Sequence, residues 1–571
     1  MYRKKNQMLT NILDYLRFGL YALLVAILLL MYQLWDKEHP AKAAVTTQAQ
    51  TETVNANNNY IPDVTSALKP TATAPSQGSL ATSSVSPHLI HVKTDVLDVT
   101  IDTLGGNIVG VDLLEYPESL HSKQAYSLLN NLSDTRYIAQ SGLLGAAGPD
   151  SSKGQVLYTT EKTSYVLEQG QKELQVKLSW KNQDGVMVDK IFSFKPNDYK
   201  IDLQYVINNQ SKQAWDGNMY LQLMRKDTPP DSTGSGLTNM ATYFGAAISS
   251  PKKPFEKISF KDMTKQDLNQ TITGGWAAMV QHYFVSAWVP EKNTTSQYFS
   301  RVTNDGLYII GNIGPKLTTA PGATVSTAAQ FYAGPAIADK LEKVAPGLDL
   351  TIDYGWFWFI SVIIFWMMQK IYNVVGNWGW SIVLVTLVIK LMFYHLSAKS
   401  YRSMSALKKL QPKLTALKEK FGEDKQKFTQ ATLELYKKEK VNPMSGCLPI
   451  LIQIPVFIAL YWVLIESVYL RQAPFILWIQ DLSTKDPYYV LPVLMGLSML
   501  LQQKLSPPPP DPMQAKVMML MPVVFTVLFI NFPAGLMLYW FVNNTLSVIQ
   551  QWYIMHSMDR AEKAEKVKKL K

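Results

Sequence analysis

A positively charged side chain, Lys390, lies inside an apolar stretch that is long enough to cross a membrane. A charge at the centre of a bilayer costs at least about 2.5–3.5 kcal/mol, so such a side chain usually faces protein or water. Thr386 and Tyr394 stand four residues before and after the lysine, and Ser397 returns to the same helix face. This pattern suits the binding of polar groups in a wet pocket. The alternative is a lysine that snorkels to the nearer membrane surface, about six residues or roughly 9 Å away.

Two further apolar stretches carry polar residues that could face the same pocket. Gln453 lies in the middle of one stretch, and Asn543, Ser547 and Gln551 recur every four residues in another. The common role of such residues in membrane proteins is hydrogen bonding between helices. A lysine among them favours a hydrated cavity instead, lined by Lys390, Thr386, Gln453, Asn543 and Ser547.

Signatures of catalysis are missing from the sequence. It contains no Gly-x-x-x-x-Gly-Lys loop, no His-Glu-x-x-His and no Gly-x-Ser-x-Gly. The single cysteine, Cys447, rules out an intramolecular disulfide and a zinc cluster built from cysteines. The histidines at 88, 91, 121 and 282 form no recognisable catalytic set. We therefore expect a protein that is not an enzyme and that has no metal site and no cofactor.

Six apolar stretches predict transmembrane helices. The first, Phe18–Trp35, follows basic residues, so we expect an uncleaved anchor with a cytoplasmic N-terminus. A cleaved signal peptide is the alternative, supported by Ala41-Lys42-Ala43. The other five predicted helices are Trp378–Leu396, Leu448–Ile465, Tyr488–Gln502, Val517–Phe532 and Leu536–Tyr553.

Basic residues gather beside these stretches and predict their orientation. Residues 397–440 hold twelve Lys or Arg against five Asp or Glu, and the segments 1–17 and 557–571 are also basic. Basic loops stay in the cytoplasm, which places this loop and both termini inside. Nucleic-acid binding is the rival interpretation, but a charge confined to membrane-flanking segments favours topology.

Orientation also decides how the stretch Gly355–Met368 is interpreted. It is short for a span and rich in Trp and Phe, as is typical of a helix that lies in the membrane interface. If it crossed the membrane, the basic loop after the next helix would lie outside. We therefore predict an interfacial helix.

The basic loop has a helical pattern of its own. Leucines and a phenylalanine recur at alternating spacings of three and four residues, which predicts one face of a coiled-coil-like helix: Leu407, Leu410, Leu414, Leu417 and Phe421. A second helix is predicted from about Asp424, so the segment 397–441 should form a cytoplasmic helical hairpin. A solvated helix pair without a partner is the alternative.

The first half of the chain has a different character. Residues 37–87 are rich in Ala, Thr, Ser, Asn, Gln and Pro, which predicts a flexible linker. Beyond it, short stretches with alternating apolar residues, such as Ile201–Ile207, predict a β-sandwich. The predicted organisation is a cytoplasmic N-terminus with an anchor (1–36), the linker (37–87), a periplasmic β-sandwich (88–340), an interfacial amphipathic helix (341–376), a membrane core of five transmembrane helices (377–555) and a basic cytoplasmic tail (556–571).

Four stretches of this chain resemble the membrane core of the YidC family. They read GNWGWSIVLVTLVIKLMFYHLSAKSYRSM (376–404), EKVNPMSGCLPILIQIPVFIALYW (439–462), LRQAPFILWIQDLSTKDPYYVLPVLMG (470–496) and DPMQAKVMMLMPVVFTVLFINFPAGLMLYW (511–540). The stretch GGWAAMVQHYFVSAWVP (274–290) is similar to the periplasmic domain of Gram-negative members. The resemblance implies a multi-pass insertase and chaperone of the bacterial inner membrane.

The resemblance also implies a site and partners. The family's groove opens to the cytoplasm and to lipid, and Lys390 takes the place of its usual arginine, keeping the charge but losing the bidentate fork. Thr386 and Gln453 would lie beside the groove, and Phe457 would belong to an apolar slide. The implied partners are nascent membrane proteins, the Sec translocon, the lipid bilayer, and the ribosome and signal-recognition-particle pathway through the hairpin and tail, without specific recognition of nucleic acid.

Two other classes of function stay open. A transporter or channel could also use a polar cavity within the membrane, although it would need a path open to both sides. The β-sandwich could instead modify sugars, because the family's domain resembles the fold of aldose epimerases.

Overall fold

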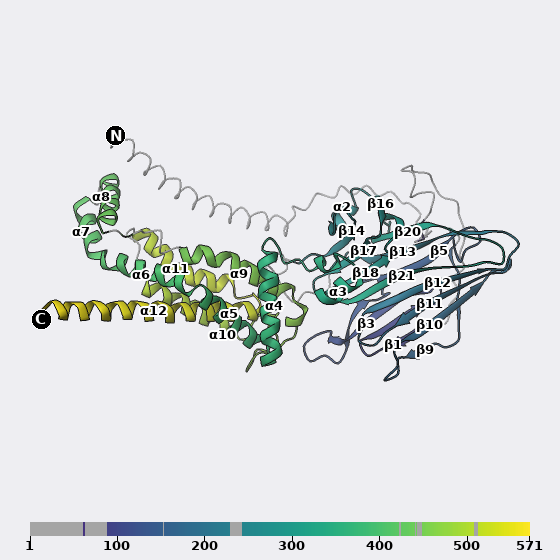
Figure 1. Ribbon diagram of the computed structural model, residues 1–571, viewed down its shortest axis with the longest axis horizontal. Coiled ribbons are helices and arrows are strands. Elements are labelled where there is room, and N and C mark those ends of the chain that lie inside the picture. The colour runs from purple at the N-terminus through teal and green to yellow at the C-terminus, as the bar shows by residue number, and fades with distance from the viewer. Residues whose placement is uncertain are drawn as a thin grey trace, which may run out of the picture. The chain divides into compact units, whose positions relative to one another are not determined.

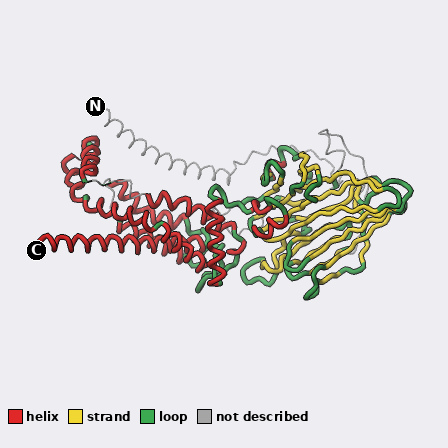
Figure 2. Tube along the Cα trace, in the orientation of Figure 1, coloured by secondary structure: helices red, strands yellow, loops and turns green. Residues whose placement is uncertain are grey.

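The computed structural model describes residues 61–62, 88–151, 154–228, 242–421, 424–439, 441, 448–506 and 512–570. The strands, from Leu89 to Pro335, form a β-domain, and the helices from Trp358 to Leu570 form a helical region that follows it in the chain (Figures 1 and 2). The predicted anchor and Cys447 lie outside the described residues, as does the linker except for Ile61 and Pro62. Pro62 is buried, and Ile61 packs against apolar residues of the β-domain.

Two sheets form the β-domain. The larger has the order β16-β19-β20-β13-β5-β3-β2-β1-β9, with β4, β6 and β7 beside this path, and the smaller has the order β15-β14-β17-β18-β21-β12-β11-β10-β8. The strands of the larger sheet are β1 (Leu89–Lys93), β2 (Leu97–Asp102), β3 (Asn107–Pro117), β4 (Ala125–Leu129), β5 (Tyr137–Leu144), β6 (Asp150–Ser151), β7 (Gly154–Gln155), β9 (Ser164–Val166), β13 (Trp215–Lys226), β16 (Asn269–Thr273), β19 (Thr295–Val302) and β20 (Leu307–Thr319). Those of the smaller sheet are β8 (Thr159–Thr160), β10 (Leu174–Lys181), β11 (Val186–Phe194), β12 (Lys200–Asn209), β14 (Gly245–Ser249), β15 (Glu256–Ile258), β17 (Trp276–Gln281), β18 (Phe284–Pro290) and β21 (Thr324–Pro335).

Alternation of apolar residues builds the core between the sheets and confirms the predicted β-sandwich. In β12, Ile201, Leu203, Tyr205 and Ile207 are all buried, while the residues between them are not. Side chains of a strand point alternately to its two faces, so one face of β12 enters the core. The short helices α2 (Phe260–Met263) and α3 (Ala338–Val344) and the turn η3 (Leu348–Thr351) complete this part of the chain.

One lysine interrupts the apolar core. Lys190 lies on the inward face of β11 and is fully buried, where its Nζ donates hydrogen bonds to the carbonyl oxygens of Gly105 (3.0 Å) and Ser141 (2.9 Å). Asp150 of β6 is also fully buried and accepts a hydrogen bond from the amide of Leu143 (2.8 Å). Burial raises the pKa of Asp150 to about 7 and lowers the pKa of Lys190 to about 7, while each charge favours the charged form of the other. The lysine links the two sheets.

The helical region contains nine α-helices among the described residues. They are α4 (Trp358–Val375), α5 (Trp378–Met392), α6 (Tyr394–Lys409), α7 (Gln411–Phe421), α8 (Lys425–Lys438), α9 (Leu448–Glu466), α10 (Val490–Leu505), α11 (Pro512–Leu528) and α12 (Ala534–Leu570), with the short turn η5 (Val468–Leu470) after α9. Helices α4, α5, α9, α10 and α12 share one apolar core, which includes Ile364, Ile382, Leu460, Met495 and Leu536.

Length and hydropathy single out α4 among the described helices. It alone is long and apolar enough to cross a membrane by itself, and α5 with α6 would pass only as one bent span. The apolar helices at 453–466, 490–505 and 515–528 are shorter. The helix that the sequence predicts to lie in the interface is thus the one that satisfies the length test for a span.

A sharp bend separates α5 from α6. The predicted continuous helix 378–396 ends at Met392, and the next helix starts at Tyr394 with a change of direction of 68°. Phe393 between them leaves helical geometry (φ −89°, ψ 8°) without a proline or glycine at the break. Lys390 therefore stands two residues before a helix end, and not six residues inside a straight span as the sequence suggested.

The predicted hairpin contains three helices. A turn at Leu410 separates α6 from α7, and α8 starts as predicted after Asp424, whose carboxylate accepts hydrogen bonds from the amides of Gln426 and Lys427. Leu410 and Leu414 are buried, as their place in the apolar pattern requires. At the other end of the chain, α12 continues without a break through the predicted tail.

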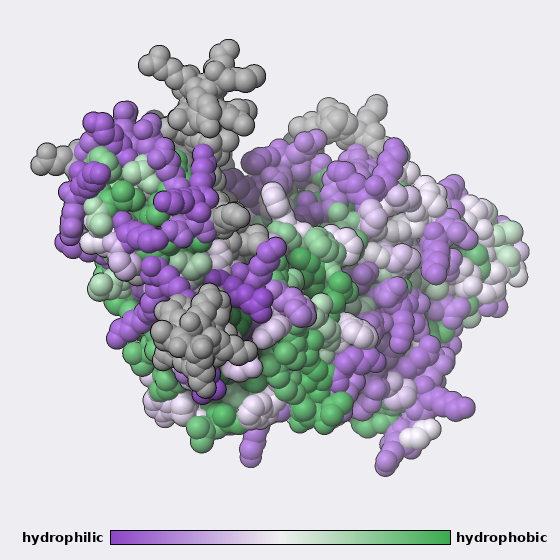
Figure 3. All heavy atoms as spheres, turned by 60° about the vertical axis from the view of Figure 1, so that its left-hand side comes forward, coloured by the Kyte–Doolittle hydropathy of each residue, from purple (hydrophilic) through white to green (hydrophobic). Residues whose placement is uncertain are grey.

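Apolar side chains cover much of the surface of the helical region. Figure 3 shows this surface as a broad green area over the helices, with hydrophilic residues in purple above it. Large exposed apolar residues on three helices are Trp358, Phe359, Ile363 and Trp366 of α4, Val493, Leu497 and Leu501 of α10, and Val517, Met519, Leu520, Val523 and Val527 of α11. A contiguous exposed apolar surface of this kind marks contact with a membrane or a partner.

Candidate binding pocket

Helices α5, α9 and α12 bring the predicted polar residues together around Lys390. The Lys390 ammonium donates a hydrogen bond to the Ser547 hydroxyl (2.7 Å), and its contact with Gln453 Oε1 is longer and weaker (3.4 Å). Both partners are neutral, so within the described chain the lysine has hydrogen-bond partners but no carboxylate at ion-pair distance. Its positive charge is left available to a ligand.

The small pocket beside this lysine contains four of the five predicted groove residues. Its lining consists of Thr386, Ile389, Lys390, Phe393, Leu396, Ser397, Gln453, Val456, Tyr539 and Asn543. The volume is about 30 Å³, which is room for about two water molecules. Ser547 is absent from the lining but reaches the pocket through its hydrogen bond to Lys390.

Two hydroxyl groups at the pocket donate to carbonyl groups of their own helices. The Thr386 hydroxyl donates to the Ile382 carbonyl one turn earlier (2.6 Å), and the Ser547 hydroxyl donates to the Asn543 carbonyl (2.7 Å). Hydroxyl groups of Ser and Thr satisfy themselves in this way inside apolar helices. Ser547 can accept from Lys390 at the same time, because a hydroxyl oxygen has two acceptor sites.

The bend at Phe393 removes one predicted residue from the site. Tyr394 stands four residues after Lys390, a spacing that shares a face only in a continuous helix. Because the helix breaks between them, Tyr394 is partly exposed, packs edge-on against His395 and does not line the pocket. Phe393 itself lines the pocket instead.

Phe457, the predicted slide residue, lies next to the pocket and not in its lining. Its ring packs edge-on against Trp540 (4.7 Å between centroids) and near-parallel to Tyr539 (6.1 Å). Tyr539 does line the pocket and was missed in the sequence. It stands four residues before Asn543, so extending the polar stripe of α12 by one turn would have found it.

The α12 stripe also ends differently from its prediction. Gln551 is buried and does not line the pocket, and its side-chain amide has no hydrogen-bond partner among the described residues. Asn544, one residue beyond the stripe, donates to the Ser498 hydroxyl of α10 (3.1 Å). This contact is the interhelical hydrogen bonding that the sequence left open as an alternative.

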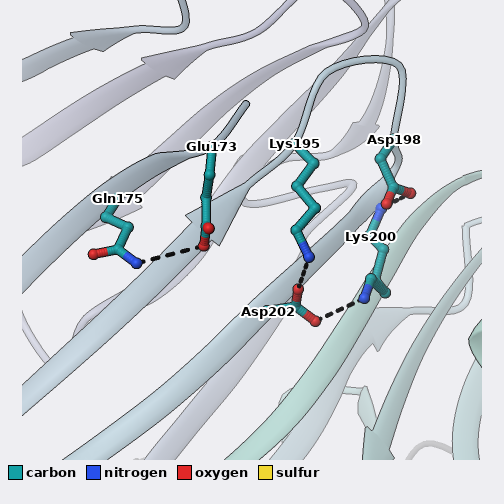
Figure 4. Close-up of polar contacts among 6 residues, drawn as sticks. All are labelled: Glu173, Gln175, Lys195, Asp198, Lys200 and Asp202. Atoms are coloured by element: carbon teal, nitrogen blue, oxygen red, sulfur yellow. Dashed lines mark hydrogen bonds and ion pairs between the residues drawn. The ribbon is translucent and has the colours of Figure 1, made fainter. Parts of the chain in front are cut away.

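A larger cleft, of about 1080 Å³, lies in the β-domain. One row of side chains crosses its floor on neighbouring strands, Gln175, Ser193, Asp202 and Gln330. Figure 4 shows Asp202 between Lys195 (3.2 Å) and Lys200 (2.9 Å), with Gln175 near Glu173. Both lysines pair with this carboxylate, and the lining contains no histidine or cysteine. The described residues also contain no group of three or more His, Cys, Asp or Glu that could hold a metal ion.

Comparison with known proteins places both parts of the chain. A family model described as YidC periplasmic domain matches residues 89–367, and one described as 60Kd inner membrane protein matches residues 370–562. The membrane protein insertase YidC of Pseudomonas entomophila is 48% identical over 557 residues, covering 95% of this chain and 98% of the relative. That of Ectopseudomonas mendocina is 45% identical over 585 residues, covering 96% and 99%.

Two solved structures match this chain at low sequence identity. An active YidC insertase with its first transmembrane domain resolved has 19% sequence identity and a TM-score of 0.37, covering 82% of this chain and 93% of that chain. A galactose mutarotase-like protein from Lactobacillus casei has 7% identity and a TM-score of 0.31, covering 43% of this chain and 99% of that chain.

Proposed function

Because the chain belongs to the YidC family of membrane protein insertases, we propose that Lys390 is the centre of a polar groove through which its substrates enter the bilayer. The protein inserts and folds nascent membrane proteins in the bacterial inner membrane. The observation that carries the groove proposal is the contact set of Lys390. A positive charge at the junction of three helices has neutral partners, Ser547 and Gln453, and lines a pocket.

The groove lowers the cost of moving polar groups into lipid. A peptide group that leaves water without a new partner costs several kcal/mol in hydrocarbon. Lys390, Gln453 and Asn543 offer donors and acceptors to the polar flank of an incoming segment. The apolar part of the segment then leaves sideways along Phe457 into lipid, driven by hydrophobic burial. No covalent step is required.

Admission of a substrate requires the pocket to widen. A volume of about 30 Å³ holds about two waters and no polypeptide. The bend at Phe393 supports such a movement, because α6 changes direction one turn from Lys390 and is not a rigid extension of α5. The groove would open toward the cytoplasm on this side.

The proposed topology has six transmembrane helices with both termini in the cytoplasm and the β-domain in the periplasm. The exposed apolar surfaces of α10 and α11 support contact with lipid. Helix α4 is assigned to the outer interface, because its apolar face is exposed while Ser361, Ile364 and Met368 pack inward. The basic hairpin and tail would then face the cytoplasm.

The proposed partners beyond the substrate follow from family membership and from the basic segments. We assign the hairpin of α6, α7 and α8, together with the basic end of α12, to the ribosome and the signal-recognition-particle pathway. The Sec translocon would be a further partner, with which the protein works on some of its substrates. Basic surface next to a membrane also attracts anionic lipid headgroups.

Substitution of Lys390 tests the groove directly. Proteoliposomes containing the parent protein, K390R, K390Q or K390E would be compared for insertion of a dependent single-span substrate. We expect near-parent insertion with K390R, a several-fold loss with K390Q and a block with K390E, at equal protein content. Parent-level insertion with K390E would contradict the groove. Release of a trapped small dye from the same vesicles would favour a channel instead.

A further inference from the structure

The loop between α9 and α10 is buried against both parts of the described chain. Val468 belongs to the apolar core of the β-domain, and Leu470 belongs to that of the helical region. Tyr469 between them packs against both cores. The loop is therefore a point at which the two hydrophobic interiors meet.

His282 of the β-domain caps the last turn of α9. It stands in the turn between β17 and β18, and its Nε2 lies 2.9 Å from the carbonyl oxygen of Ile465, one residue before the helix ends. Because a carbonyl oxygen only accepts, this ring nitrogen carries the proton and donates. The last four carbonyls of an α-helix have no partner within the helix, so a side chain from the β-domain satisfies one of them.

Arg471 fastens the same loop to β3 of the larger sheet. Its Nη2 donates to the carbonyl oxygens of Pro117 (2.7 Å), the last residue of β3, and Glu118 (3.0 Å). The guanidinium also lies over the rings of Tyr126 (5.3 Å) and Phe284 (5.7 Å), which stack on each other. A charge-assisted hydrogen bond is stronger than a neutral one, and a planar guanidinium can donate such bonds while it also makes cation–π contacts.

We propose that His282 and Arg471 are positioning residues through which the β-domain fixes the outer end of α9 and thereby sets the position of its groove residues. Helix α9 carries Gln453 and Phe457. From Gln453 to the end of α9 the helix rises by about 20 Å. A small tilt of α9 at its fixed outer end would therefore displace Gln453 and Phe457 at the groove.

Besides these two contacts, the outer half of α9 is held by apolar packing and a further hydrogen bond. On its outer half, α9 accepts a hydrogen bond at the Ala459 carbonyl from the Ser361 hydroxyl of α4 (3.0 Å). Val463 and Leu464 of this half are buried in the shared apolar core, and Pro455 lies within the helix. Proline removes a backbone hydrogen bond and kinks a helix, which makes its direction depend on outside contacts.

A labelling experiment on the full-length protein tests this coupling. With Cys447→Ser as background, a cysteine at Phe457 or Gln453 would report its maleimide-labelling rate in R471A, R471K, H282A and the R471A/H282A double variant. Lys172→Ala, at an exposed position of the β-domain, is the matched control. We expect at least a threefold change of rate in the double variant, an intermediate change in R471K and none in K172A.

The outcomes separate this inference from the groove proposal on which it rests. Insertion of the dependent substrate would be measured in the same variants without the added cysteine, and protease resistance of the β-domain would confirm that it stays folded. Altered labelling with unchanged insertion would keep the coupling and contradict the groove. Unchanged labelling in a double variant with an intact β-domain would overturn the coupling.

Discussion

The Lys390 ammonium and the Ser547 hydroxyl form a 2.7 Å hydrogen bond between α5 and α12. This contact gives the lysine a partner without neutralising it. An aspartate in place of Ser547 would supply the missing negative charge. We therefore expect S547D to reduce insertion of a dependent substrate at least tenfold, because the introduced carboxylate would form an ion pair with Lys390 and neutralise the positive charge that is proposed to attract the substrate. Insertion into proteoliposomes is the measurement.

The control for this variant lies on the same helix. Ser557 donates only to the Ile554 carbonyl of its own helix in the described structure (2.8 Å), and its side chain is exposed. S557D adds the same charge away from Lys390 and should leave insertion within about twofold of the parent. Equal losses in S547D and S557D would point to a general effect of acidic residues on α12.

The buried lysine of the β-domain predicts a stability effect that is independent of the groove. K190M leaves Asp150 buried without its partner charge and two backbone carbonyls without their donor. Breaking a buried pair in this way costs about 3–5 kcal/mol. The urea midpoint of the β-domain, followed by its sheet circular dichroism in the full-length protein, should fall accordingly.

Two further variants define what the buried pair contributes. D150N/K190M should lose less than the sum of the single losses, by about 0.5–3 kcal/mol, because each single variant leaves an unpaired group. Lys177→Met removes a neighbouring but exposed lysine, which pairs with Asp189 at the surface (2.8 Å). That change should cost less than about 1 kcal/mol. Additive losses in the double variant would mean that the two groups do not interact.

The placement of α4 leads to a prediction of depth. Spin labels at Phe359, Ile363 and Val374, in a Cys447→Ser background, would report their distance from the membrane centre. An interfacial helix gives nearly equal, shallow depths at all three sites. A spanning helix gives depths that change by about 22 Å between the first and last site. Such a gradient would refute the interfacial assignment and require a new topology.

His282 predicts that the contact between β-domain and α9 weakens in acid. Burial lowers the pKa of His282 to about 4 from an ordinary 6.5, and the charge of Arg471 lowers it further, although the hydrogen bond to Ile465 opposes this. A histidine released from the contact has the ordinary pKa of 6.5, so between pH 6.5 and 4 it binds a proton that the docked histidine does not bind. The stability of the contact is thus complete above pH 6.5 and declines as the pH falls toward 4.

The measurement uses the labelling assay at two pH values. The ratio of labelling rates at Phe457→Cys between the parent and H282N should be constant at pH 7.5 and 7.0 and change at pH 5. Asparagine can still donate a hydrogen bond but does not titrate, so it controls for the pH dependence of the thiol itself. Other groups near the contact, including Arg471, Tyr283 and Asp481, remain in both proteins. A constant ratio down to pH 5 would exclude the histidine as the cause.

Patterns of local hydropathy predicted the β-sandwich, the start of α8 at Asp424 and the grouping of Lys390 with Thr386, Gln453 and Asn543. The strands of the sandwich and the polar stripe on each helix depend on side-chain periodicity within one element, which a sequence displays directly. The break at Phe393 depends on packing among helices distant in the chain, and no proline or glycine marks it. For the same reason Tyr394 was placed in the site and Phe393 was not.

The burial of Lys190 and Asp150 could not be predicted from the sequence for a related reason. Lys190 occupies an inward position of β11, where the alternation of apolar residues has a gap. Its partners come from Gly105, Ser141 and Asp150, each more than thirty residues away along the chain. Contacts of this range are properties of the fold and cannot be found from the pattern of one strand. The loop contacts of Arg471 and His282 join residues that are even farther apart along the chain.

Helix α12 runs without a break from Ala534 to Leu570, so one helix carries both pocket residues and the basic C-terminal segment. Its length is about 55 Å, far more than the roughly 30 Å of a bilayer interior, so in the proposed topology α12 would extend well beyond the lipid. Asn543 and Ser547 lie in the first half of α12, and the basic residues near Arg560 lie in its last third. If a partner binds the C-terminal part of this continuous helix, we expect the part that carries Ser547 to move with it and the surroundings of Lys390 to change.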